Sequence, residues 1–261
     1  IKEPLAHMLK SQLSARPLDF QTYASILLVA SPSVPIYFLI KVLQLQRRSW
    51  FNFVVQMGIA FSIGALAGDL FTHIIPETFE KIAHHDHTAG VVIVAGICFY
   101  YFLDKFFANV ADSKALRAQT KNIIFLFADG VHNITDGFAL ASLYKLSGQL
   151  GFESGVTSTV SIFLHEVFHQ LGDFSVMLHR KHSLEYTLLS QIVTGTFALL
   201  GGYIALNIDQ AYDVYLNLFV VVSFCYVIFT QILPELIGTK SGFLMMVAEC
   251  VMIATGFLIL H

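Results

Sequence analysis

Charged residues are scarce in this chain of 261 residues: Asp, Glu, Lys and Arg make up 13% of it, whereas 56% is hydrophobic and the mean hydropathy is +0.68. A soluble domain has about 25% charged residues, so an ordinary soluble protein is excluded. The net charge of −3 provides no basic surface for nucleic acid. The three cysteines, Cys98, Cys225 and Cys250, have unrelated spacings, which argues against disulfides or a CxxC metal site. Without a phosphate-binding glycine loop, ATP hydrolysis is not expected.

Long apolar runs are abundant. A helix needs about 20 residues to cross about 30 Å of hydrocarbon, and suitable runs fall at 21–45, 52–79, 89–109, 120–146, 153–179, 184–206, 213–237 and 241–260. They predict an all-α polytopic membrane protein with eight transmembrane helices. Because the loops are short, we expect one transmembrane domain over 20–261 after a lead-in segment over 1–19. The first residue, Ile1, indicates that a signal peptide or extension was removed.

Basic residues indicate how the chain is oriented, because Lys and Arg are held back on the cytoplasmic side of a membrane. Of the 15 in the chain, ten flank the loops after the first, third, fifth and seventh runs, and five lie opposite. This bias predicts two non-cytosolic termini, in the plasma membrane or a membrane of the secretory pathway.

A seven-residue pattern occurs twice. Residues 71–77 read FTHIIPE and residues 229–235 read FTQILPE, with five identities in seven positions. The second and seventh runs cross in opposite directions under this orientation, so the copies predict an inverted repeat, as in many transporters whose substrate site lies at mid-bilayer. Chance similarity between apolar segments is the alternative. Pro76 and Pro234 should bend their helices at matching depths, as Pro32 and Pro35 should bend the first.

Two stretches place ionisable side chains at bilayer depth. The fourth run contains His132-Asn133-Ile134-Thr135-Asp136-Gly137, and the fifth contains His165-Glu166-Val167-Phe168-His169-Gln170. Residues four apart share one helix face, so each stretch offers a pair able to share one ion. Charged groups at this depth cost roughly 2.5 to 3.5 kcal/mol each on insertion scales, and they usually line a pathway or bind something.

The two stretches together form a candidate metal site. Its donors are the imidazoles of His132, His165 and His169 and the carboxylates of Asp136 and Glu166. This mixture suits Zn²⁺, whereas Mg²⁺ and Ca²⁺ prefer oxygen ligands alone. Fe²⁺, Mn²⁺ and Cd²⁺ remain open as secondary substrates. A lone intramembrane His or Asp often only hydrogen-bonds a neighbour, but five such groups in register are harder to explain that way.

Nearby residues extend this pattern. Asp129 continues the fourth-run stripe and Asp173 the fifth, so both are candidate pathway residues. Gly130, Gly137 and Gly172 remove side-chain bulk where another helix approaches closely.

Two other functions fit parts of this pattern. His165-Glu166-x-x-His169 is also the zinc metalloprotease motif, in which the glutamate is the general base. An intramembrane zinc metalloprotease is therefore the alternative, although it needs a third protein ligand, for which only Asp136 is a candidate. A metal-sensing receptor would hold a fixed ion without flux. The sixth to eighth runs offer no buried Asp motif for the protease, and the inverted repeat argues against the receptor. We therefore expect a divalent metal transporter and not an enzyme.

The motifs resemble those of the ZIP family of divalent-metal transporters, in the eukaryotic branch that reads HNxxDG in the fourth helix and HExxHE in the fifth. Asp69 and His73 in the second run and Pro234-Glu235 in the seventh also resemble the family pattern, over roughly residues 20–260. The resemblance implies a binuclear site between helices four and five and metal uptake toward the cytosol. It also implies a three-plus-two-plus-three helix arrangement in the lipid bilayer and a homodimer.

Carried over by position, His132, His165 and Glu166 resemble the principal metal site, and Asp136 with His169 the adjoining one. Asn133 would contribute to either. A second set would line the pathway: Asp69, His73, Asp129, Gln170, Asp173 and Glu235. Two residues depart from the branch. Phe168 replaces a proline, which predicts a straighter helix, and Gln170 replaces a glutamate, which predicts a weaker second metal site.

Further histidines lie outside the runs. His84, His85 and His87 follow the second run and would collect metal, or simply belong to a solvated loop. His179 and His182 flank Arg180 and Lys181 and would pass metal onward, or form an interfacial anchor.

Overall fold

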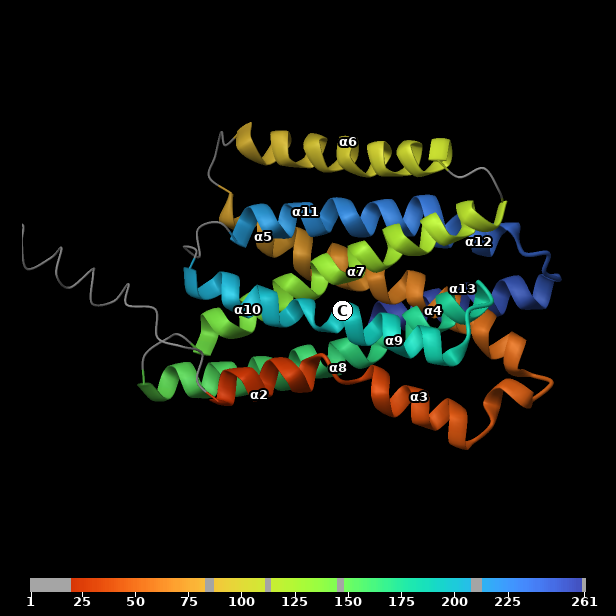
Figure 1. Ribbon diagram of the computed structural model, residues 1–261, viewed down its shortest axis with the longest axis horizontal. Helices are drawn as coiled ribbons and strands as arrows, with labels where there is room; N and C mark the ends of the chain where they lie inside the picture. Colours follow the sequence, from red (N-terminus) through yellow and green to blue (C-terminus); the bar gives the residue numbers. More distant parts are fainter. Residues whose placement is uncertain (1–19, 83–86, 111–113, 145–147, 208–212, 260–261) are drawn as a thin grey trace, which may run out of the picture.

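The computed structural model describes residues 20–82, 87–110, 114–144, 148–207 and 213–259. Within these ranges the secondary structure is helical, and the helices lie side by side in an elongated bundle (Figure 1). The predicted lead-in segment, residues 1–19, lies outside the described residues. The all-helical prediction is confirmed for the ranges described.

The helices follow the apolar runs. The first half holds α2 (Phe20–Val29), α3 (Ser33–Val42), the 3-10 turn η1 (Leu45–Arg47), α4 (Phe51–Asp69), the π-helical segment η2 (Leu70–Ile74), α5 (Ile75–Lys81) and α6 (His87–Val110). The second half holds α7 (Lys114–Tyr144), α8 (Gly148–His179), α9 (Leu184–Gly195), α10 (Phe197–Asn207), α11 (Asp213–Tyr226), the π-helical segment η4 (Val227–Ile232), α12 (Leu233–Gly238) and α13 (Phe243–Ile259).

The length and composition of these helices support a multi-pass membrane protein. Five stretches in the described residues are long and apolar enough to cross a bilayer: Phe51–Lys81, His87–Asn109, Gln119–Tyr144, Leu184–Ala205 and Val214–Gly238. The α2–α3 pair, bent by 41°, makes a sixth if it is one span. The predicted eight spans are thus found only in part. The apolar helix α13 has 17 residues, and α8, which has 32, carries the polar residues of the fifth-run motif.

Pro32 lies at a break between two helices, whereas the helical stretches continue through Pro76 and Pro234. Pro32 occupies the break between α2 and α3, because a proline nitrogen donates no hydrogen bond to the preceding turn. Pro76 and Pro234 each occupy the first turn of a short helix that directly follows a π-helical segment. Such wide turns are often found at functional sites.

The two copies of the repeated pattern share this local structure. Thr72 Oγ1 donates to the carbonyl of Gly68, and Thr230 Oγ1 donates to that of Tyr226, both at 2.7 Å. Figure 1 shows α5 and α12, the ends of the two copies, at opposite ends of the bundle. The copies therefore match in conformation and run in opposite directions.

Glycines bring α4 into close contact with its neighbours. A Cβ at Gly64 would overlap the carbonyl of Ile253 in α13, and one at Gly68 would lie 2.8 Å from the carbonyl of Phe257. A Cβ at Gly172 of α8 would lie 2.6 Å from Ser62 Oγ of α4. Gly172 thus fits α8 against α4, and this contact brings Asp69 toward the fifth-run histidines.

Gly130 and Gly137 have different partners, namely Phe197 and Ala198 of α10. The glycines therefore bring the motif helices toward α4 and α10 rather than toward each other. A buried apolar cluster joins α4, α7, α8 and α11 beside the motifs, and it includes Ile63, Ala128, Met177 and Phe224.

The outer helices present apolar side chains outward. Helix α6 lies at one edge of the bundle (Figure 1), and Val91, Val94, Tyr101 and Phe102 are exposed along it. Exposed apolar faces of this size are expected where lipid covers them. Cys98, Cys225 and Cys250 are free cysteines.

Candidate metal centre

Three helices supply the candidate ligands. Helix α7 presents His132 and Asp136 from one face, and α8 presents His165, Glu166 and His169. Helix α4 ends at Asp69, whose carboxylate faces the α8 histidines. Helix α8 is continuous through Phe168, as the absence of proline there predicts.

The donors fall into two groups. In the first, one ligand atom each from Asp69, His132, His165 and His169 lie within 4.8 Å of one another. Asp69 Oδ2 lies 3.5 Å from His165 Nε2 and 3.8 Å from His169 Nε2. These separations exceed hydrogen-bond lengths, but they are the spacings expected of atoms that surround an ion about 2.0–2.2 Å from each.

The second group consists of His132, Asp136 and Glu166, under the same distance limit. His132 Nε2 lies 3.7 Å from Asp136 Oδ2 and 3.4 Å from Glu166 Oε1. His132 therefore belongs to both groups, and the two positions adjoin one another. This is the geometry of two neighbouring cation positions with one histidine between them. This division differs from the one that the resemblance implies, because His169 groups with His165 and Glu166 groups with Asp136.

Aromatic contacts hold the imidazoles in place. The ring centroids of His165 and His169 lie 4.4 Å apart, and those of His132 and His169 lie 5.0 Å apart. Phe224 of α11 packs against His132 at 4.9 Å and against His169 at 5.8 Å. Side-chain positions fixed by packing allow ligands to converge without reorganisation.

The donor atoms are buried and lack hydrogen-bond partners. Glu166 is 1% exposed, and neither of its carboxylate oxygens has a partner. The same holds for Asp69 Oδ2, both ring nitrogens of His132 and His169 Nε2. A buried polar atom without a partner is costly, and a divalent cation would satisfy several of these atoms at once. The donor set of imidazole nitrogens and carboxylate oxygens fits zinc.

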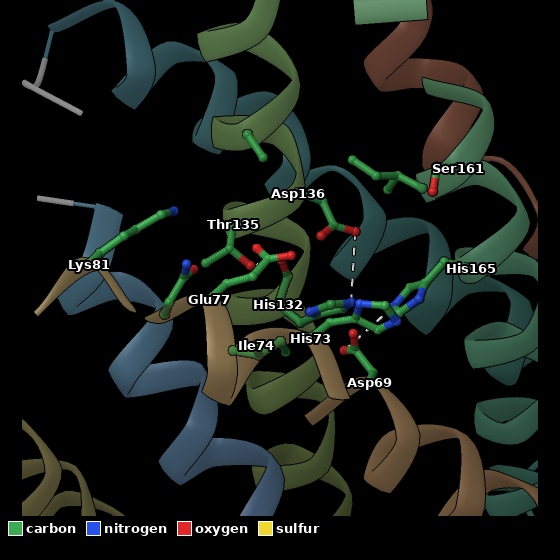
Figure 2. A pocket seen from close by; sticks show the side chains of 13 residues that line it. Asp69, His73, Ile74, Glu77, Lys81, His132, Thr135, Asp136, Ser161 and His165 are labelled. Atoms are coloured by element: carbon green, nitrogen blue, oxygen red, sulfur yellow. Dashed lines mark hydrogen bonds and ion pairs between the residues drawn. The ribbon is translucent and has the colours of Figure 1, made fainter. Parts of the chain in front are cut away.

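A cavity of about 260 Å³ leads to the donors. Figure 2 shows the imidazoles of His132 and His165 between the carboxylates of Asp136 and Asp69. His73, Glu77 and Lys81 line the cavity toward the end of α5. The cavity thus connects one end of the bundle with the buried donors.

The remaining fourth-run and fifth-run residues lie close by. Asn133 is fully buried, and its amide donates at 3.0 Å to both the carbonyl and Oδ1 of Asp129, which leaves its own Oδ1 without a partner. Asp129 and Asp173 are one turn beyond the ligands on their helices and belong to neither group. Gln170 is fully buried, and neither atom of its amide has a partner.

The other predicted pathway residues lie apart from the donors. His73 lines the cavity but belongs to neither donor group, whereas Glu235 pairs with Arg180 beyond the far end of α8. His84 and His85 lie outside the described residues, and His87 begins α6. His182 contacts Asn122, and partial burial together with the Arg180 charge lowers the pKa of His182.

Sequence reasoning underrated or missed three residues. Asp69 was expected on the pathway, yet the structure groups it with the ligands, a position that only the packing of α4 on α8 defines. Phe224 is one of many aromatic residues in an apolar run, so nothing in the sequence distinguishes it. Arg180 was counted only as a loop charge, because its partners come from α7 and α12.

Comparison with known proteins agrees with this geometry. The family model described as "ZIP Zinc transporter" matches residues 18–122 and 111–261. Zinc transporter ZIP13 of Pongo abelii is 24% identical over 70% of this chain and 59% of its own length. Zinc transporter ZIP4 of Mus musculus is 21% identical over 73% of this chain and 39% of its own length. Zinc transporter YKE4 of Saccharomyces cerevisiae is 24% identical over 64% of this chain and 53% of its own length.

The chain thus spans between about two fifths and three fifths of the length of these relatives. Their names are those of transporters rather than enzymes, and the family match covers nearly all the described residues. Together with two adjoining groups of buried metal-type donors inside a helical membrane bundle, this match shows that the chain belongs to the ZIP zinc transporter family.

Proposed function

We propose that this protein carries divalent metal ions, chiefly Zn²⁺, across a membrane through the two adjoining donor groups. The observation that supports this most strongly is the convergence of Asp69, His132, His165 and His169 within 4.8 Å, deep in an apolar bundle and at the end of a cavity. A fixed structural ion would not need a cavity that leads to it, whereas an ion in transit does.

The two groups have distinct parts in this proposal. The first group is the principal position, because it has three imidazoles and because three of its four residues, Asp69, His132 and His165, line the cavity. The second group, with Asp136 and Glu166, adjoins it through His132, and the unpartnered Oδ1 of Asn133 is a further donor beside them. Gln170 contributes no charge, which supports weaker binding at the second position. His73, Asp129, Asp173 and Glu235 remain candidates for the path.

The membrane arrangement is part of the proposal. Eight spans follow if α2 with α3, α8 and α13 each cross the bilayer together with the five stretches selected by length and composition. The matched π-helical segments before Pro76 and Pro234 support an inverted repeat with three helices on each side of α7 and α8. The basic-residue bias supports two non-cytosolic termini and uptake toward the cytosol. Fe²⁺, Mn²⁺ and Cd²⁺ are proposed as secondary substrates, and a homodimer as the assembly.

The protease alternative receives no support. In such an enzyme the motif glutamate holds a water molecule and leaves the metal to the histidines and a third ligand. Glu166 instead lies 3.4 Å from His132 Nε2, within a donor group of its own. We therefore expect Glu166→Gln to weaken zinc binding, whereas loss of a general base would leave binding unchanged.

The transport function is tested in liposomes that contain the purified protein and a zinc indicator. We expect zinc to move down its gradient and His165→Ala to abolish the flux. Leu164→Ala, next in sequence but 54% exposed on the outer face, is the matched control and should keep the flux. A folded, zinc-binding protein without flux would reject transport.

A further inference from the structure

A buried ion pair lies at the end of the bundle opposite the cavity. Arg180, just after α8, donates from Nε to both carboxylate oxygens of Glu235 at 3.2 Å, and Arg180 Nη2 lies 3.1 Å from Glu235 Oε1. Arg180 Nη1 donates to Asn122 Oδ1 at 2.9 Å. The side chain of Arg180 is 8% exposed and that of Glu235 is 18% exposed. Breaking such a pair is strongly unfavourable, although its net contribution to stability is not necessarily large.

This ion pair connects the helices that carry the metal donors with the second repeat copy. Asn122 belongs to α7, Arg180 follows α8, and Glu235 belongs to α12. The chain turns sharply after Arg180, because Lys181 has a left-handed backbone and His182 N donates to the carbonyl of Met177. This helix ending brings His182 against Asn122. A joint movement of α7 and α8 relative to α12 must therefore break the contacts between Arg180 and Glu235, whereas the contact between Arg180 and Asn122 lies within the moving pair.

The repeat relates Glu235 of the ion pair to Glu77 in the first copy. Glu77 and Glu235 occupy equivalent positions of the two copies, each directly after the proline. Glu77 lines the open cavity, whereas Glu235 is held by Arg180. Arg180 lies eleven residues after His169, or about 16 Å along the helix axis at 1.5 Å per residue. One end of the bundle is thus open to the donors, and the equivalent carboxylate at the other end is occupied by a cationic side chain.

Gln231 indicates that polar groups continue between the donors and this pair. It lies in η4 one turn before Glu235, is 2% exposed, and neither atom of its amide has a hydrogen-bond partner. A buried amide without partners is costly in an apolar bundle, and a hydrated cation passing by would supply partners.

We propose that Arg180 closes the α12 end of the ion path, and that Glu235, once Arg180 has moved away, lines the exit for the divalent cation. The inference rests on the proposed transport function. The guanidinium keeps the carboxylate neutralised while the cavity end is open. When α7 and α8 shift relative to α12, the contacts between Arg180 and Glu235 break and the negatively charged carboxylate faces the leaving ion.

The test measures closure separately from flux. In protein whose native cysteines are replaced by serine, Gln231→Cys is exposed to a membrane-impermeant thiol reagent, added on the side where Arg180 lies. We expect slow labelling at position 231 when Arg180 is present. Labelling should be at least about tenfold faster in Arg180→Gln, because the closed state loses the contacts between Arg180 and Glu235. Lys121→Gln is the matched control: Lys121 Nζ lies 4.0 Å from the same carboxylate but its side chain is 49% exposed, so its loss should change nothing.

Two double variants distinguish opening of the α12 end from misfolding. The pair Arg180→Gln with Glu235→Gln leaves no unpaired buried charge and should also label fast, whereas the exchanged pair Arg180→Glu with Glu235→Arg should return toward slow labelling. Unchanged labelling in both Gln variants overturns the proposal, and so does equal acceleration by Lys121→Gln. Zinc flux by the wild-type protein is measured in parallel. Flux with unchanged labelling rejects the gate alone, and fast labelling without wild-type flux rejects transport alone.

Discussion

Asp69→Asn tests whether the carboxylate at the end of α4 is a metal ligand or a group that the ion merely passes. Asp69 is 4% exposed, and its Oδ2 has no hydrogen-bond partner although two imidazole nitrogens lie 3.5 and 3.8 Å away. The substitution keeps the shape and an oxygen donor but removes the negative charge. Its effect on cation binding is therefore almost purely electrostatic.

The expected size follows from the geometry. Two unit charges 4 Å apart interact by about 4 kcal/mol at an effective dielectric of 20, and each 1.4 kcal/mol is tenfold in affinity. The charge of a ligand carboxylate should thus raise the zinc affinity by roughly a hundredfold to a thousandfold. Changing a group that only orients the ligands costs about 10-fold to 100-fold, and a group farther along the cavity should cost less.

The assay is zinc titration of the detergent-purified protein by isothermal calorimetry or competition with an indicator. Glu77→Gln is the control, because Glu77 lies two turns further along the same cavity wall and carries the same charge. We expect at least about a hundredfold weaker binding for Asp69→Asn and less than about threefold for Glu77→Gln. The unfolding temperature of the zinc-free protein should not fall in Asp69→Asn, since the mutation removes a buried charge. Equal effects of the two variants, or less than tenfold for Asp69→Asn, would refute the assignment of Asp69 to the ligands.

Three further results are expected. Gly64→Ala should destabilise the protein by about 1–3 kcal/mol in a thermal or denaturant assay, because its Cβ would overlap the carbonyl of Ile253. Gly90→Ala is the control and should not destabilise it, since a Cβ there meets open space. Equal stability of the two variants would contradict the close α4–α13 contact. The pKa of His182, followed by NMR, should lie below the ordinary value of about 6.5. As the pH falls, the unfolded chain then binds a proton at this histidine before the folded chain does. The stability contributed by neutral His182 is therefore present above about pH 6.5 and lost as the pH falls below it. A pKa at or above about 6.5 would contradict the partial burial of this ring. Zinc flux in liposomes should fall between pH 7 and pH 5, because histidine and carboxylate ligands bind metal only when deprotonated, and flux that stays constant over this range would contradict the ligand set.

Much of the fold and of the site follows from local patterns in the sequence. The apolar runs predict the helices, and the spacing of His132 with Asp136 and of His165 with His169 predicts which side chains share a helix face. Pro32 marks the break between α2 and α3, and Pro76 and Pro234 mark the change from π-helix to α-helix, because the consequence of a missing backbone N–H is local. For the same reason the repeated FTxIxPE pattern predicts matching local structure in both copies.

The rest depends on which helices pack together. Asp69 joins the donors only because Gly172 allows α8 to approach Ser62 of α4. Arg180 and Glu235 lie 55 residues apart in sequence, and no local spacing indicates that they meet. Hydropathy and length select five stretches among the described residues, and α8 is not one of them, because it carries polar ligands that other helices bury.

X-ray absorption at the zinc edge of the purified protein, loaded with one equivalent of zinc, tests the central claim most directly. The account predicts a shell of nitrogen and oxygen neighbours at about 2.0–2.2 Å with imidazole scattering, and loss of part of that scattering in His132→Ala, because His132 belongs to both donor groups. A spectrum with water neighbours alone, or one that His132→Ala leaves unchanged, would contradict it.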